Sequence, residues 1–123
     1  MKNNVIISAK NLVKSFYNGE IKQTIINKLD LDIYENDFTI IMGSSGAGKS
    51  TLMYLLSGMD KADSGSITFK DKDICKMNND ELAIFRRKNC GFVFQQIYLL
   101  DKMSLLDNVL TSGLLTNKNK KEV

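Results

Sequence analysis

A single lysine among glycines and serines is the clearest chemical signal in the sequence. Residues 43–50 read GSSGAGKS and follow directly on the apolar run FTIIM. Gly43, Gly48, Lys49 and Ser50 meet the pattern G-x-x-x-x-G-K-[ST]. Backbone N–H groups can converge on a phosphate where no Cβ blocks their approach and positive φ is allowed. The stretch therefore predicts a loop that wraps the phosphates of a nucleotide, rather than a flexible surface turn.

The residue types in this loop divide the work of holding a triphosphate and its metal ion. Lys49 supplies a mobile positive charge for the β and γ phosphates, and the Ser50 hydroxyl is placed to ligate Mg²⁺. A helix that begins at Ser50 points its positive end at the same place. The predicted nucleotide-binding residues are Gly43, Ser44, Ser45, Gly46, Ala47, Gly48, Lys49, Ser50 and Thr51.

Two flanking elements must position such a loop, and the sequence predicts both. Residues 38–42, FTIIM, are continuously apolar, which indicates a strand covered on both faces. Residues 50–58, STLMYLLSG, indicate a short helix with Gly58 in the left-handed position past its end. Strand, glycine loop and helix in this order are the context that the motif requires.

The remaining patterns predict a chain of the α/β class. Alternating leucines and aspartates in LDLDI indicate a half-buried outer strand. Asn78 with Glu81, and Ser104 with Asp107, have the spacing of helix caps. The other expected strands and helices are residues 5–16, 29–33, 66–69 and 91–95 as strands, and 81–88 and 105–115 as helices, before a polar tail from 116 to 123.

Composition limits the class of protein and its partners. With 123 residues, 43% of them hydrophobic and 25% charged, the chain has room for one compact domain. A net charge of +3 is too small and too dispersed to make nucleic acid the expected partner. Cys75 and Cys90 form no Cys-x-x-Cys pair and the chain has no histidine, so free thiols are expected. Neither a signal peptide nor a membrane-spanning run is visible, which predicts a cytoplasmic protein that reaches membranes only through a partner.

A phosphate-binding loop does not by itself define a reaction. Hydrolysis also needs an acidic residue that holds the metal and a group that positions water. The run IYLLD, residues 97–101, offers Asp101 for this role and would make the chain a complete small kinase or GTPase-like switch. The run is not β-branched and follows FQQ without a turn or helix, which disfavours a separate parallel strand. A non-catalytic nucleotide-binding or interaction module is the third possibility.

Four segments, read together, carry a family resemblance. They are KNLVKSF, IIMGSSGAGKSTLMYLLSGMDKADSGSI, FRRKNCGFVFQQIYLL and SLLDNVL, in unbroken order between residues 8 and 112. Together they resemble the first half of an ABC-transporter ATP-binding subunit, and GFVFQQ and LDNV look most like exporters of lipoproteins, macrolides and antimicrobial peptides. The resemblance implies that residues 1–123 are the N-terminal part of one nucleotide-binding domain. Its parts would be a P-loop NTPase core, an antiparallel β subdomain and the start of a helical subdomain.

The resemblance also assigns roles to single residues. Phe16 falls where the family has an aromatic residue that stacks on adenine, and the neighbouring Tyr17 could take its place. The alternative that both rings pack in the core stays open. Gln95 matches the glutamine that reaches Mg²⁺ and the attacking water, so that Lys49 and Gln95 would act at the reacting phosphate, and Ser50 and Gln95 at the metal. The segment from Gln95 to Met103 would face a transmembrane permease subunit, or else pack as a small satellite core.

Two departures from the family pattern shape the expectations for this chain. Asn36 and Asp37 stand where the family commonly has Gly-Glu, and asparagine tolerates the left-handed turn. The signature motif, the metal-binding aspartate of Walker B with its catalytic glutamate, and the switch histidine would lie beyond residue 123.

In the intact parent, the resemblance implies a head-to-tail homodimer of nucleotide-binding domains that hydrolyses ATP to drive export. That dimer would sit at the cytoplasmic face of a membrane through its permease. We expect the 123 residues alone to bind Mg-ATP weakly without turnover, and strand 38–42 to lack neighbours.

Overall fold

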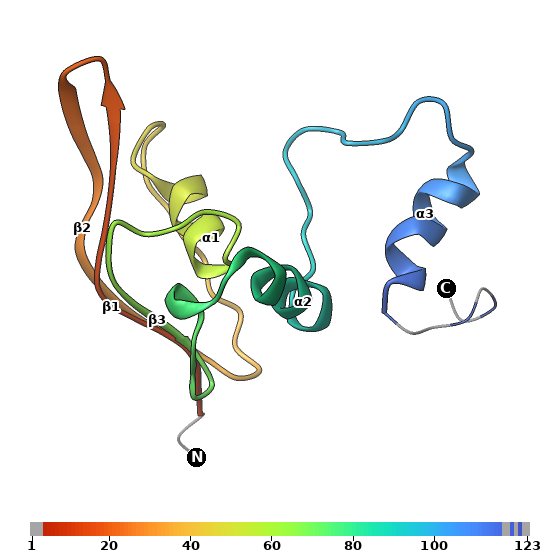
Figure 1. Cartoon of the computed structure of the whole chain (residues 1–123), viewed down its shortest axis with the longest axis horizontal. Coiled ribbons are helices and arrows are strands. Elements are labelled where there is room, and N and C mark those ends of the chain that lie inside the picture. Colours follow the sequence, from red (N-terminus) through yellow and green to blue (C-terminus); the bar gives the residue numbers. More distant parts are fainter. Residues whose placement is uncertain (1–3, 117–118, 120, 122–123) are drawn as a thin grey trace. The chain divides into compact units, whose positions relative to one another are not determined.

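The computed structural model describes residues 4–116, 119 and 121, in two compact units that divide between Leu82 and Ala83. The first unit contains the sheet and the phosphate-binding loop, and the second contains the C-terminal helix. The elements in chain order are β1 (Val5–Asn18), β2 (Ile21–Tyr34), α1 (Lys49–Leu56), β3 (Ser64–Phe69), β4 (Lys72–Asp73), the 3₁₀ helix η1 (Ile74–Lys76), α2 (Asn79–Asn89) and α3 (Leu105–Leu114) (Figure 1).

The sheet is antiparallel, with the strand order β2-β1-β3-β4. A long hairpin of β1 and β2 dominates it and turns at Gly19, whose φ is 63°. The expected strands 5–16 and 29–33 are confirmed, and so is the outer position of the second one. Strand β2 begins already at Ile21, because its first residues pair with β1 although their sequence shows no regular alternation.

The core of the first unit lies between α1 and the sheet. Leu12 of β1, Leu55 of α1 and Ile67 of β3 are its largest fully buried side chains. Leu55 and Ile67 also line a small cavity of about 90 Å³. The helix therefore presents its leucines to the sheet, as the pattern of residues 50–58 predicts.

The local signals for turns and caps are confirmed. Asn78 N–H donates to Glu81 Oε2 at 2.8 Å, and Glu81 N–H donates to Asn78 Oδ1 at 2.9 Å, which forms the capping box of α2. The Ser104 hydroxyl oxygen accepts from the backbone N–H of Asp107 at 3.1 Å at the start of α3. Asn36 takes the left-handed turn with φ 58°. Cys75 and Cys90 are free. Most of the expected polar tail lies outside the described residues.

The prediction of a covered strand at residues 38–42 is wrong. This segment forms no strand, and Phe38, Ile40 and Met42 are 87%, 68% and 85% exposed. A strand requires a hydrogen-bonded neighbour. Within the described residues no strand lies beside this segment, so its apolar side chains lack the cover that their sequence indicates. This agrees with the expectation that the segment would lack neighbours.

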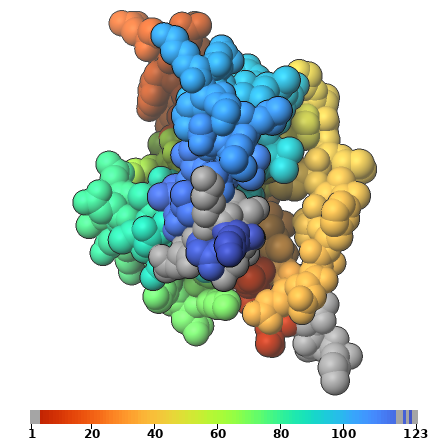
Figure 2. All heavy atoms as spheres, turned by 90° about the vertical axis from the view of Figure 1, so that its right-hand side faces the viewer, coloured from red at the N-terminus to blue at the C-terminus, as the bar shows by residue number. Residues whose placement is uncertain are grey.

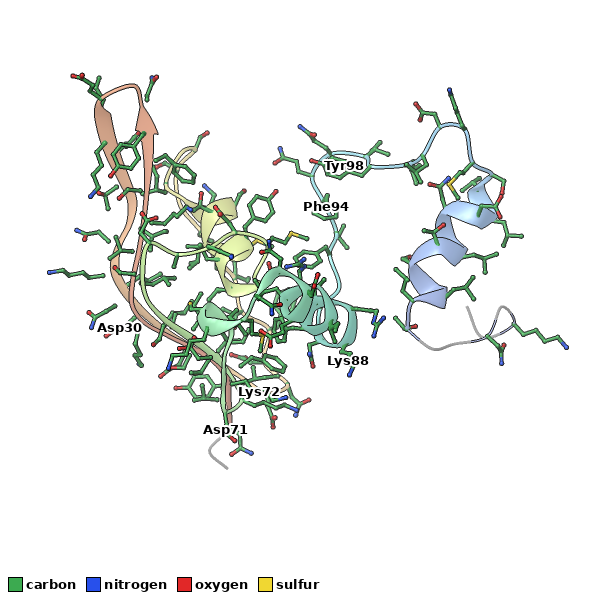
Figure 3. The ribbon with its side chains drawn as sticks, viewed as in Figure 1. Asp30, Asp71, Lys72, Lys88, Phe94 and Tyr98 are labelled. Carbon is green, nitrogen blue, oxygen red and sulfur yellow. The ribbon has the colours of Figure 1, made fainter. Side chains whose placement is uncertain are left out.

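The prediction of a strand at residues 91–95 is also wrong. Val93 is 99% exposed, and no ladder forms in this part of the second unit. The aromatic rings pack on one another instead, with the Phe92 and Phe94 ring centroids 5.7 Å apart and those of Phe94 and Tyr98 5.0 Å apart, edge to face (Figure 3). Local aromatic contacts take the place of sheet pairing.

Replacing Gly65 by alanine tests how closely β3 approaches β1. Gly65 has φ 92°, and a Cβ there would lie 2.5 Å from the Asn11 carbonyl oxygen and 2.7 Å from the Leu12 Cα. We expect Gly65→Ala to lower the free energy of unfolding by at least about 3 kcal/mol, measured by urea denaturation, because backbone strain and overpacking add.

Gly19→Ala is the matched control for this substitution. Gly19 also has positive φ, at 63°, but nothing lies within 4 Å of its added Cβ. Only the conformational strain remains, so the loss should be about 1–2 kcal/mol. Equal losses for the two variants would show that the close approach at Gly65 has no energetic weight.

Candidate nucleotide-binding site

The P-loop, residues 43–50, forms an exposed turn that leads directly into α1. The Ala47 N–H donates to the Ser44 carbonyl oxygen at 3.1 Å and closes a turn around Ser45 and Gly46. Residues 43–47 are all exposed. The motif thus folds as an open loop at the head of a helix, which is the geometry that binding of an anion requires.

Lys49 reaches back over the loop that precedes it. Its Nζ donates to the carbonyl oxygens of Gly43 at 2.8 Å and of Ser44 at 2.6 Å. An ammonium group has three N–H donors, so one remains for a ligand. The two carbonyl contacts hold the charge beside the backbone of Gly43 and Ser44, within the P-loop.

The first turn of α1 is open to a ligand. Gly48 is the N-cap residue, with φ 92° and ψ 16°, and no side chain caps the helix. The first N–H groups of an α-helix have no intrahelical acceptor and carry partial positive charge. Ser50 lies in this turn and is exposed. Backbone donors, a cation and a hydroxyl therefore gather at one helix end.

Strand β2 packs against the P-loop at Gly48. A Cβ on Gly48 would lie 2.6 Å from Ile25 Cγ2 and 3.3 Å from Ile26 Cδ1. Only glycine fits this close approach and the positive φ of position 48 together. The hairpin therefore fixes where the head of α1 lies.

Phe16 lies farther along the same hairpin. Its side chain is 44% exposed, and that of the neighbouring Tyr17 is 69% exposed. This exposure disfavours a core role for both rings. Phe16 pairs with Gln23, two residues along β2 from the Ile25 that contacts Gly48. Two residues of strand span about 7 Å, so the exposed ring and the P-loop lie within reach of one nucleotide.

Gln95 belongs to the second unit and lies at a bend, not at the end of a strand. The edge-to-face contact of Phe94 with Tyr98 closes that bend. Gln95 is exposed, and its role toward Mg²⁺ stays a prediction.

Asp101 lies in an exposed turn rather than at the end of a strand, which weighs against a complete small kinase or switch.

Exposed apolar side chains continue from Gln95 to α3. Tyr98, Leu99 and Leu100 are 64%, 57% and 55% exposed, and Leu105 and Leu106 are 80% and 58% exposed. The stretch that carries them is coloured cyan to light blue in Figure 2. These values disfavour the alternative of a small satellite core. An exposed run of this kind indicates a surface for a partner.

The amide of Asn108 holds the end of this run against α3. Its Oδ1 accepts from the Leu100 N–H at 2.9 Å, and its Nδ2 donates to the Leu100 and Ser104 carbonyl oxygens at 3.2 and 3.0 Å. Residues 100–104 are therefore an ordered loop, not a loose connection.

Asp32, Cys75 and Cys90, which lie outside the P-loop, have shifted pKa values. The Ser8 hydroxyl, which donates to Asp32 Oδ1 at 2.6 Å, lowers the pKa of that carboxyl group, and Lys10 at 3.4 Å adds to the effect. Burial raises the pKa of the Cys75 and Cys90 thiols. Both thiols are thus held in the protonated form, which is a poor nucleophile.

A polar contact that the sequence did not reveal lies beside Phe16. Lys14 Nζ stands 5.3 Å from the centre of the Phe16 ring and donates to Asp60 Oδ1 at 3.2 Å. The spacing of Lys14 and Phe16, two residues apart on a strand, places them on one face and could have signalled the pair. Asp60 lies 46 residues away, and no sequence pattern points to it.

Comparison with known proteins identifies the family. The ABC transporter family model matches residues 26–123, which include the whole P-loop. The chain belongs to the ABC transporter family. Within the described residues, no helix is long and apolar enough to cross a bilayer.

The similar proteins are ATP-binding components of this family. The chain is 42% identical over 117 residues to the lipoprotein-releasing system ATP-binding protein LolD of Wigglesworthia glossinidia brevipalpis, covering 95% of this chain and 51% of LolD. It is 39% identical over 109 residues to the macrolide export ATP-binding/permease protein MacB of Pasteurella multocida, covering 89% of this chain and 17% of MacB. The chain thus spans about half the length of LolD.

The solved structures that match are ATP-binding cassettes. The dimeric cassette MJ0796 in a post-hydrolysis state, bound to ADP and Pi, matches with a TM-score of 0.87 at 32% identity, over 92% of this chain and 49% of that one. This likeness confirms the expected fold class, a P-loop NTPase cassette with an antiparallel β subdomain.

Gly48→Ala tests whether β2 positions the P-loop. We expect this ABC cassette variant to lose at least about tenfold in affinity for a fluorescent ATP analogue, because the added methyl strains φ and collides with Ile25 Cγ2. A second substitution at Ile25 separates the two causes.

Ile25→Ala removes Cγ2 and should restore part of the affinity of Gly48→Ala, whereas Ile25→Val keeps Cγ2 and should restore none. Equal affinities for the two double variants would refute the contact as the cause.

The raised pKa values of Cys75 and Cys90 predict slow alkylation. Iodoacetamide reacts with the thiolate, so both thiols in the folded protein should react more slowly at pH 7.5 than in urea. The rates in the folded protein should rise as the pH increases through the raised pKa values. Mass spectrometry of each peptide measures the rates, and equal rates in folded and unfolded protein would contradict the prediction.

Proposed function

We propose that this chain is the P-loop part of the ATP-binding subunit of an ABC exporter and that it binds Mg-ATP through residues 43–51. The observation that carries the proposal is Lys49, which donates to two carbonyl oxygens of the P-loop and is itself the first residue of α1, a helix with no side-chain cap. A cation, free backbone donors and a helix N-terminus at one exposed place favour a polyphosphate over any neutral ligand.

The residues present fit a magnesium ion carried by the phosphates. Ser50 is the protein ligand that the loop offers, and a hard cation of this kind takes oxygen ligands. When bound, the ion neutralises charge that develops on the phosphates during transfer. Lys49 holds the phosphates, and Gln95 orients the water in the intact subunit.

The adenine base is assigned to the exposed ring of Phe16. Phe16 pairs with Gln23, which lies two residues along β2 from Ile25. Because Ile25 contacts Gly48 of the P-loop, this place on the hairpin supports the assignment. A phenylalanine offers a π-face for stacking and makes no demand on hydrogen bonding.

The partners of the intact subunit follow from the exposed surface and from the relatives. The apolar side chains between Gln95 and Leu106 offer a surface for a helix of a transmembrane permease, which would hold the subunit at the cytoplasmic face of the membrane. A solved relative is a dimer, and we propose a head-to-tail homodimer here also. The exporter class rests on the similarity to LolD, of a lipoprotein-releasing system, and to MacB, a macrolide export protein.

A polypeptide of these 123 residues tests the proposal. We expect Mg-ATP binding by isothermal titration, and phosphate release no faster than the buffer background. Lys49→Met should weaken binding by about tenfold to a hundredfold, because a hydrogen-bonded charge is lost. Lys72→Met, which removes an exposed lysine from β4, is the matched control and should leave affinity unchanged.

Two outcomes would contradict this function. Unchanged affinity in folded Lys49→Met would remove the P-loop assignment. Robust phosphate release that is lost in Asp101→Ala would favour the alternative of a complete small kinase or switch.

A further inference from the structure

Lys14 is held in place by the loop that follows α1. Its Nζ donates to Asp60 Oδ1 at 3.2 Å and to the Lys61 carbonyl oxygen at 2.7 Å. The Lys14 side chain is only 13% exposed, whereas the side chain of Lys10 on the same strand is 52% exposed. A lysine shielded to this extent needs fixed acceptors, so its position is well defined.

Two more hydrogen bonds fasten the same loop to β1. The Ser15 N–H donates to Asp63 Oδ2 at 2.6 Å, and the Asp63 N–H donates to the Val13 carbonyl oxygen at 2.8 Å. Residues 13–15 are therefore bound to residues 60–63 on both sides of Lys14. The next residue of β1 is Phe16.

The fixed ammonium group stands beside the ring of Phe16. The distance from Lys14 Nζ to the ring centre is 5.3 Å, within the range of a cation–π contact. Residues two apart on a strand share a face, so the contact follows from the strand geometry. Because the cation is anchored to Asp60, it restricts the conformation of the Phe16 ring, which is 44% exposed.

We propose that Lys14, anchored by Asp60, is a positioning residue that presents the Phe16 ring to the nucleobase of the bound nucleotide. This inference rests on the proposed function, in which Phe16 stacks on the base. It makes α1 the link between the two ends of the ligand, because the P-loop opens the helix and Asp60 follows its C-terminus. The phosphate site and the base site are then held by one element.

The alternative is that Lys14 only stabilises the sheet. The two cases differ in what the base contributes to binding. A nucleotide uses both sites, whereas inorganic triphosphate with Mg²⁺ uses the P-loop alone. Changes in the P-loop or in the fraction of folded protein affect both affinities equally. The ratio of the two affinities therefore reports on the base site alone.

The experiment measures the affinities of the full chain for Mg-ATP and for Mg-triphosphate by isothermal titration. Lys14→Met should weaken ATP binding by about threefold to tenfold and leave triphosphate binding unchanged. Lys10→Met is the matched control, since Lys10 lies on the same strand and pairs with Asp32 at 3.4 Å without a ring contact. It should change neither affinity.

A double variant tests whether Lys14 acts through the ring. In a Phe16→Ala background, Lys14→Met should have no further effect on ATP affinity. Asp60→Asn keeps an oxygen acceptor, removes the counter-charge and should give a smaller loss in the same direction. It serves as the second variant if Lys14→Met does not fold, and Lys14→Arg, which keeps the cation, should retain the ATP preference.

The outcomes separate this inference from the proposed function. If Phe16→Ala leaves the ratio of ATP to triphosphate affinity unchanged, the base site itself is wrong. If Phe16→Ala lowers the ratio but Lys14→Met and Asp60→Asn do not, only the positioning role is overturned. Equal losses for ATP and triphosphate in Lys14→Met would assign the residue to the fold alone.

Discussion

The hold of Lys49 on the carbonyl oxygens of Gly43 and Ser44 is the interaction on which the site depends. A loop of glycine, serine and alanine has few side chains that could order it, and ordering backbone costs about 1–2 kcal/mol per residue. The ammonium group spans the turn and supplies that order. It also places a positive charge at the positive end of α1, where carbonyl dipoles offset the repulsion and where an anion would be most strongly attracted.

Local features of the fold could be predicted from the sequence because each depends on neighbouring residues. The capping box of Asn78 and Glu81, the turn at Asn36 and the helix that follows the P-loop require only a few residues each. The P-loop residues belong to the same class, since the motif and its geometry lie within one short stretch. The residue types and their spacing are therefore enough to indicate the chemistry of this loop.

The predictions that were wrong concern features that depend on residues distant in the sequence. The segments 38–42 and 91–95 have the composition of strands, but composition indicates burial and β-propensity rather than the presence of a neighbour. Neither segment has a strand partner among the described residues, so the first stays exposed, and in the second the ring of Phe94 packs on those of Phe92 and Tyr98. The contact of Lys14 with Asp60 is unpredictable for the same reason, because nothing in the sequence of β1 indicates which loop will approach it.

The short helix α1 explains why the two ends of the site can be held with so few residues. Its eight residues span about 12 Å, from the open N–H groups that face a phosphate to the turn that leads to Asp60. Leu55 anchors the helix in the core, and Ile25 of β2 fixes its head. Any shift of α1 along its axis would therefore move the phosphate donors and the anchor of Lys14 together. A rigid helix between two loops keeps the spacing of phosphate and base constant, which two independent loops could not do.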